Sequence, residues 1–217
     1  MHGHVQTTQR RRLLLAALGL VSSCLSTGGG AATHRPTPAQ SRGPFYPDQL
    51  PLDQDNDLTR LSPARAATSG SAKGELTDLT GQVLAADGTA LPDALVEIWQ
   101  CDAHGRYLHT GDRGEQRRDA GFQGYGKTRT GADGGYRFRT IKPVPYPGRA
   151  PHIHVAVTAA DGRQLVTQLY VEGAPENARD FLRKRLSPAQ RKLVTVPFRP
   201  SGDDAGSLRA RFDMVLG

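Results

Sequence analysis

Apolar and polar residues alternate over short stretches along most of the chain, and turn residues separate these stretches. Alternation with a period of two is typical of strands that bury one face, and the pairs Asp87-Gly88 and Asp161-Gly162 favour tight turns between strands. The chain holds 25 glycines and 15 prolines, which favours many short elements over long helices. Strands are predicted in residues 76–88, 94–103, 125–141, 151–173 and 207–217.

Two of these segments are long enough for a pair of strands. Residues 125–141 are predicted to form a hairpin around Gly131–Gly135, and residues 151–173 to form two strands around Asp161-Gly162. Strands at short, regular spacing with Gly and Asp turns indicate an all-β fold. We therefore expect an antiparallel β-sandwich with long loops.

The remaining segments contribute little regular structure. One short helical segment is expected near the C-terminus, within residues 175–194, with an interruption at Pro188. Residues 62–75 are rich in Ser, Ala and Gly, and residues 110–124 have no apolar periodicity, so both are predicted to be loops. No internal repeat is present.

The N-terminus has the pattern of an export signal. Residues 13–21 form an apolar run that is too short to cross a bilayer, and it follows Arg10, Arg11 and Arg12. The sequence QRRRLLL is similar to a twin-arginine export signal. We therefore expect export to the periplasm or to the cell surface.

The same region resembles a lipoprotein processing site. In VSSC at 21–24, Cys24 would become the lipidated first residue of the mature chain and the only link to a membrane. Cleavage further on, after the alanines at 31–32, is the alternative. The expected organisation is a signal peptide at 1–23, a flexible tether at 24–42 and a β-sandwich domain at 43–217.

Charge and cysteine content narrow the class of protein. The formal charge is +7, and removal of the three N-terminal arginines would lower it to +4. No long run of Lys and Arg remains and aromatic residues are few, so a nucleic-acid-binding surface is not indicated. A mildly basic surface would help to attract an anionic small molecule. Cys24 and Cys101 are the two cysteines, and the processing pattern at Cys24 argues against a disulfide.

His152 and His154 are the first candidate metal ligands. Alternate residues on a strand point to the same face, so both imidazoles can bind one metal ion. The motif is short, and a solvent-facing pair of histidines is the alternative. Tyr146 lies between two prolines and Arg149 stands three residues before His152. Taken singly, Tyr146 is better explained as a packed aromatic ring in a turn, and Arg149 as a solvated surface charge.

A second candidate follows the predicted strand at 94–103. Tyr107 comes just after the end of that strand, and Trp99 within it is expected to pack in the core. His104 and His109 are further candidate ligands, although lone loop histidines are usually solvated or locally hydrogen-bonded.

Tyrosine ligands restrict the choice of metal. The phenol has a pKa of about 10, so it needs a strongly acidic cation to ionise at neutral pH. Fe(III) is such a cation, and tyrosinate is a known ligand of ferric haem. Zinc prefers His, Cys and carboxylate ligands. A site of two phenolates and two imidazoles therefore indicates non-haem Fe(III).

With these residues in place, the chain closely resembles the intradiol ring-cleavage dioxygenases, the family of protocatechuate 3,4-dioxygenase and catechol 1,2-dioxygenase. The resemblance runs in order over about residues 37–217. It rests on TPAQSRGPFYP at 37–47, DNDLTRL at 55–61, LTGQVLAADGTALPDALVEIWQCDAHGRY at 79–107, TRTGADGGYRFRTIKPVPYP at 128–147, RAPHIHV at 149–155 and TQLYVEG at 167–173.

The resemblance implies a role for each metal ligand. Tyr107 matches the tyrosinate that stays on the iron, and Tyr146 matches the tyrosinate that leaves when substrate binds. His152 and His154 match the two imidazole ligands.

It also implies catalytic residues and a reaction. Arg149 matches an arginine near the bound catecholate, and Gln168 matches a polar residue of the same pocket, although a solvent-facing strand position is the alternative for Gln168. Tyr146 would also serve as a base. Both atoms of O₂ would enter a catechol, which would open between its hydroxyls to a cis,cis-muconate-type product.

Two other interpretations make different predictions. An exported β-sandwich binding module with a non-catalytic metal site would be colourless, whereas tyrosinate bound to iron absorbs visible light. A copper or zinc site on the histidines would keep its metal after Tyr107→Phe. The preferred catechol is left open by the sequence, and so is a homo-oligomer.

Overall fold

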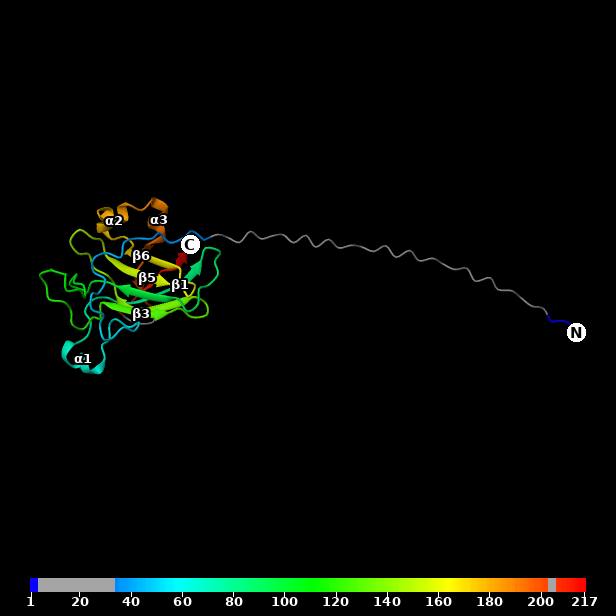
Figure 1. Cartoon of the computed structure of the whole chain (residues 1–217), viewed down its shortest axis with the longest axis horizontal. Coiled ribbons are helices and arrows are strands. Elements are labelled where there is room, and N and C mark those ends of the chain that lie inside the picture. Colours follow the sequence, from blue (N-terminus) through cyan, green and yellow to red (C-terminus); the bar gives the residue numbers. More distant parts are fainter. Residues whose placement is uncertain (4–33, 203–205) are drawn as a thin grey trace. The chain divides into compact units, whose positions relative to one another are not determined.

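The computed structural model describes residues 1–3, 34–202 and 206–217. Within this part of the chain, two five-stranded sheets pack face to face (Figure 1). The first sheet contains β1 (Leu76–Ala85), β4 (Gly135–Ile141), β8 (Arg199–Pro200), β9 (Leu208–Arg211) and β10 (Met214–Leu216). The second has the order β3 (Tyr125–Arg129), β2 (Leu95–Trp99), β5 (His152–Thr158), β6 (Gln164–Val171) and β7 (Thr195–Val196).

Alternating side chains build the core between the two sheets. Leu79 of β1 and Phe138 of β4 are fully buried there, and they belong to the same cluster as Ile98 of β2 and Ile153 of β5. Each of these residues has neighbours along its strand that point the other way. The predicted β-sandwich is therefore confirmed.

Most strand pairs of the described residues are antiparallel, as predicted, but both sheets also contain parallel pairs. β9 and β10 both run parallel to β1, and β7 runs parallel to β6. Alternation tells which face of a strand is buried, but the direction of pairing depends on where the preceding connection ends. The closing segment 207–217 also divides into two strands, separated at Phe212 and Asp213.

The predicted hairpin at 125–141 is wrong for a related reason. β3 pairs with β2 in the second sheet, whereas β4 pairs with β1 in the first. The turn itself is present, since Gly131 N donates to Gly135 O at 2.9 Å. This turn links the two sheets and does not pair β3 with β4. Local turn chemistry reverses the chain, but it does not select a strand's partner. The predicted pair within 151–173 is confirmed, with β5 and β6 antiparallel.

Short helices account for most of the remaining regular structure. α1 (Pro63–Ser69) lies in the segment predicted to be a loop at 62–75; Pro63 suits the first helical turn and the alanines after it favour helix. The predicted single helical segment at 175–194 is three helices: η1 (Pro175–Ala178), α2 (Phe181–Lys184) and α3 (Pro188–Leu193). Pro188 is the first residue of α3, so it starts a helix as well as interrupting the segment 175–194.

Figure 1 shows α2 and α3 beside each other near β6, with α1 well separated from both. No helix of the described residues is long and apolar enough to cross a membrane. The predicted signal peptide, apart from residues 1–3, and Cys24 lie outside the described residues.

The chain from residue 34 onward packs against the sandwich. Thr37 N donates to Val215 O at 3.0 Å, and Gln40 N donates to Val166 O at 2.8 Å. Residues 34–42 therefore do not behave as the free tether predicted for 24–42. Backbone pairing and the burial of Thr37 hold them in place, which places the following residues over one face of the second sheet.

Candidate metal centre

The candidate site lies on the face of the second sheet that points away from the first. His152 and His154 alternate with Ile153, which belongs to the core, so both imidazoles point outward. Strand register places Trp99 of β2 and Gln168 of β6 directly opposite His154. Loops and the N-terminal segment cover this face and leave His152 and His154 only 1% and 2% exposed. The solvent-facing alternative for the histidine pair is therefore wrong.

The four predicted ligands converge there. Nε2 of His152 lies 3.2 Å from Nε2 of His154 and 3.3 Å from the hydroxyl oxygen of Tyr107. The Tyr146 ring lies against both Tyr107 and His152, with 5.5 Å between ring centroids in each case. Donor atoms about 2.1 Å from one ion lie roughly 3.0–3.4 Å apart when they occupy adjacent coordination positions. The spacing of the Tyr107, His152 and His154 donor atoms thus fits a single metal ion, and the Tyr146 ring lies beside them.

The chemistry of the donors fits a ferric ion. No group of three or more His, Cys, Asp or Glu side chains in the described part of the chain could hold a metal. The further side chains that could join His152 and His154 on a metal are the two tyrosines beside them. Burial lowers the pKa of the His152 imidazole to about 3 and lowers the pKa of His154 well below its usual value, which leaves both rings neutral and able to coordinate. Burial raises the pKa of the phenols of Tyr107 and Tyr146. Only a strongly Lewis-acidic cation would therefore ionise them.

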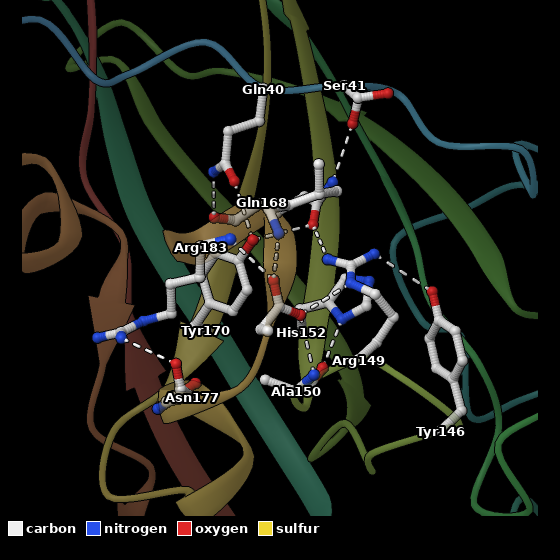
Figure 2. Close-up of polar contacts among 12 residues, drawn as sticks. Gln40, Ser41, Tyr146, Arg149, Ala150, His152, Gln168, Tyr170, Asn177 and Arg183 are labelled. Carbon is white, nitrogen blue, oxygen red and sulfur yellow. Dashed lines mark hydrogen bonds and ion pairs between the residues drawn. The ribbon is translucent and has the colours of Figure 1, made fainter. Parts of the chain in front are cut away.

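Each histidine is oriented by a different neighbour. Nδ1 of His152 lies 2.6 Å from Ala150 O, and this contact assigns its proton to Nδ1 and leaves Nε2 free to coordinate (Figure 2). His154 has no hydrogen-bond partner at Nδ1 among the described residues. Its ring instead stacks on Trp99, with centroids 4.9 Å apart and planes 7° apart. Trp99 is fully buried, as the sequence predicted, but it also supports a ligand.

The N-terminal segment covers the ligands. The Phe45 ring stacks on Tyr107 at 5.1 Å between centroids. Gly43 lies against His154, so close that an added Cβ would be 3.1 Å from Cε1 of that ring. The sequence offered no signal for these two contacts, because they join residues more than 60 positions apart.

Arg149 occupies the centre of a polar network next to the ligands, shown in Figure 2. Its guanidinium donates to Gln168 Oε1 at 2.5 Å, to Asp180 Oδ2 at 2.8 Å and, more weakly, to the Tyr146 hydroxyl at 3.4 Å. Gln168 Nε2 donates to Ser41 O at 2.9 Å, which fixes the direction of its amide. Arg149 is 7% exposed and Gln168 is fully buried, so the solvent-facing alternatives for both residues are wrong.

Two other histidines are not part of the site. Nδ1 of His104 contacts Arg117 O at 2.9 Å, and Nδ1 of His109 accepts a hydrogen bond from Gly111 N at 2.9 Å. Both follow the expected behaviour of loop histidines. Asp180 was not among the residues predicted from the sequence, although an Asp just before a helical stretch is a common N-cap signal.

Comparison with known proteins assigns the family. Residues 42–217 match the family described as Dioxygenase. The chain is 37% identical to the protocatechuate 3,4-dioxygenase beta chain of Burkholderia cepacia over 171 residues, covering 75% of this chain and 71% of that one. It is 30% identical to a hydroxyquinol 1,2-dioxygenase of Corynebacterium glutamicum over an alignment of 242 residues, covering 99% of this chain and 75% of that one.

Solved structures agree with this assignment. The dioxygenase domain of a carbohydrate-binding fusion protein from Streptomyces sp. SirexAA-E is 31% identical, with a TM-score of 0.63, and 84% of this chain and 98% of that chain are covered. Catechol 1,2-dioxygenase from Acinetobacter sp. ADP1 is 28% identical, with a TM-score of 0.62 over 83% of this chain and 62% of that one. The chain therefore belongs to the intradiol ring-cleavage dioxygenase family.

Proposed function

We propose that this chain is a non-haem iron(III) dioxygenase that opens a catechol ring between its two hydroxyl-bearing carbons. The observation that carries the proposal is the convergence of Tyr107, Tyr146, His152 and His154 at one buried point. Both atoms of O₂ would appear in the ring-opened dicarboxylic acid, so the reaction consumes no external reductant. Family membership favours this enzyme over a binding module with a non-catalytic metal site.

Tyr107, Tyr146, His152 and His154 would hold the iron. Bound Fe(III) would supply the Lewis acidity that binds a catechol through both oxygens and draws electron density from its ring. Two phenolates balance much of the charge of a ferric ion, and the neutral imidazoles add none. The rings of Phe45 and Trp99 stack on Tyr107 and His154 and would help to keep water away from these ligands.

The two tyrosines have different surroundings, which suits different roles. Tyr107 is 3% exposed and is held under Phe45, so it would remain in place throughout turnover. Tyr146 is only half-buried, and its hydroxyl contacts Arg149. We assign to the Tyr146 oxygen the removal of a proton from one substrate hydroxyl as substrate takes its place. The guanidinium of Arg149 would then face the negative charge on the ring, and Gln168 would hold that guanidinium.

The substrate would be a catechol-type aromatic compound. The relatives named above are dioxygenases of protocatechuate, hydroxyquinol and catechol, which share two adjacent ring hydroxyls. A cavity of about 180 Å³ opens beside Tyr146 and Arg149. Substituents on the ring would project into this cavity, so its lining would choose among catechols.

The test begins with the purified chain loaded with ferric iron. The measurements are bound iron, visible absorption, O₂ uptake with a panel of catechols and incorporation of labelled O₂ into the product. We expect stoichiometric iron, a visible band from tyrosinate-to-iron charge transfer and both labelled atoms in the product. His152→Ala should abolish all three, whereas the matched loop variant His104→Ala should leave them intact. Full iron loading without visible absorption, or no O₂ uptake with any catechol, would refute the proposal.

We also propose that the protein is exported and that Cys24 carries a lipid. The supporting observations are the arginine triplet at 10–12, the short apolar run at 13–21 and the VSSC sequence. Changing the three arginines to lysine should leave the protein in the cytoplasm. Cys24→Ala should still permit export but release the protein from the membrane fraction. Unchanged fractionation of the lysine variant would exclude the twin-arginine route.

A further inference from the structure

Asp180 is a buried carboxylate that the roles proposed above do not use. It stands just before α2, and its side chain is 0% exposed. Oδ1 accepts hydrogen bonds from the backbone N–H groups of Leu182 at 3.0 Å and Arg183 at 2.8 Å. These two bonds fix the carboxylate to the first turn of the helix, so its other oxygen points in a defined direction.

That other oxygen holds two consecutive residues of the site loop. Oδ2 accepts from Arg149 Nε at 2.8 Å and from Ala150 N at 2.9 Å. Ala150 in turn accepts through its carbonyl oxygen from Nδ1 of His152 at 2.6 Å. One carboxylate therefore links the start of α2 to both the site arginine and the peptide that orients a metal ligand.

The contact with Arg149 leaves the guanidinium little freedom. With Nε held by Asp180, one terminal nitrogen points at Gln168 Oε1 and the other at the Tyr146 hydroxyl (Figure 2). A planar guanidinium held at two of its nitrogens has a fixed orientation. The nitrogen beside Tyr146 is then the one that faces the cavity when Tyr146 moves.

Stability alone does not account for the pair. The two side chains are 6% and 0% exposed, and a buried ion pair contributes little net stability because desolvation offsets its attraction. A Ser or Asn would cap α2 equally well without a charge. What the carboxylate adds is charge neutralisation and orientation of Arg149.

We propose that Asp180 is a positioning residue for ring cleavage, acting through Arg149. This inference rests on the proposed dioxygenase function. Asp180 contacts no donor atom of the metal ligands. It lines the cavity beside Tyr146 and Arg149, but both of its oxygens already accept hydrogen bonds from the protein. Its main effect on the reaction would therefore be to hold the guanidinium in its orientation.

A double-mutant cycle with the iron-loaded protein tests the proposal. Asp180→Asn keeps the cap acceptor and the shape but removes the charge. In the wild-type background we expect kcat to fall roughly 10- to 100-fold with little change in KM, because displacing a charge-stabilising group mainly affects the transition state. In the Arg149→Gln background the same substitution should change kcat by less than about twofold. Iron content and the visible band should stay unchanged in each variant.

Asp53→Asn is the matched control. Asp53 likewise accepts hydrogen bonds from a backbone N–H group (Ser62) and from an arginine side chain (Arg65), but it contacts no residue of the site. It should leave kcat unchanged. If Asp180→Asn does not fold, Asp180→Glu takes its place in the same cycle. Glutamate keeps the negative charge but displaces it. Equal losses of kcat in both backgrounds, or no loss in a folded variant, would overturn the positioning role. Absence of activity in the wild type would instead refute the proposed function.

Discussion

The rings of Trp99 and His154 lie parallel, 4.9 Å apart, on neighbouring strands β2 and β5. His154 has no hydrogen-bond partner at Nδ1 among the described residues, whereas His152 is tied to Ala150 O. Packing against an indole is therefore what orients one imidazole, and a hydrogen bond orients the other. The two ligands should respond differently to mutation of their surroundings.

Trp99→Leu should weaken iron binding. Leucine fills part of the space but offers no flat surface to His154, so we expect iron affinity to fall about 10- to 100-fold, as for loss of a group that supports a metal ligand. The cavity should also lower the free energy of unfolding by about 2–3 kcal/mol. Iron competition with a chelator and urea unfolding measure the two effects. Trp99→Phe, which keeps an aromatic face, should retain most of the affinity; equal losses in both variants would exclude stacking as the cause.

The two tyrosine ligands should differ when each is changed to phenylalanine. Tyr107 is buried under Phe45, whereas Tyr146 is half-buried. We expect Tyr107→Phe to lose most of the bound iron and more than about 99% of kcat, and Tyr146→Phe to keep its iron with an altered visible band. Metal analysis and visible spectra of the two purified variants provide the comparison. Normal activity of Tyr107→Phe would remove it from the ligand set.

Gly43→Ala should disturb the site beyond its effect on the backbone. Gly43 has φ +72, and an added Cβ would lie 3.1 Å from Cε1 of His154. Gly162 has φ +88 with no atom within 4 Å of an added Cβ, so Gly162→Ala is a matched control for strain alone. Each should lose about 1 kcal/mol of unfolding free energy from the left-handed backbone. Only Gly43→Ala should shift the visible band; a shift in both would point to a general loosening of the fold.

Asp180 should contribute to stability in a pH-dependent way. Burial raises the pKa of this carboxyl, but the N–H groups of Arg183 and Ala150 and the guanidinium of Arg149 outweigh burial and hold it below its usual value. A carboxyl with a lowered pKa in the folded state stabilises the protein above its unfolded pKa of about 3.9, and this contribution is lost as pH falls through the folded pKa.

The difference in unfolding free energy between wild type and Asp180→Asn should therefore be constant near neutral pH. It should shrink as pH falls below about 4, because the carboxyl of the unfolded wild-type chain takes up its proton there while the folded one is still ionised. Urea unfolding of both proteins across this range gives the difference directly. A difference that grows as pH falls would contradict the lowered pKa.

Local patterns in the sequence were sufficient for part of the fold. Alternation and Asp-Gly turns correctly predicted β5, β6 and the turn between them, because those two strands are adjacent in the chain and pair with each other. The same kind of signal failed at 125–141, where β3 and β4 join different sheets. Helix α1 was not predicted, because a Ser/Ala/Gly-rich composition favours a loop and obscures the helix signal of Pro63 and the alanines that follow it.

The sequence by itself determined the reaction family and the residues that converge at the site. His152 and His154 share a face because strand geometry has a period of two, and two tyrosines beside them restrict the metal by their acidity. Tertiary structure alone decided that Trp99 stacks on His154, that Gly43 and Phe45 cover the ligands, and that Asp180 holds Arg149. These contacts join residues that are distant in the chain, and only the packing of loops and helix α2 onto the second sheet brings them within reach.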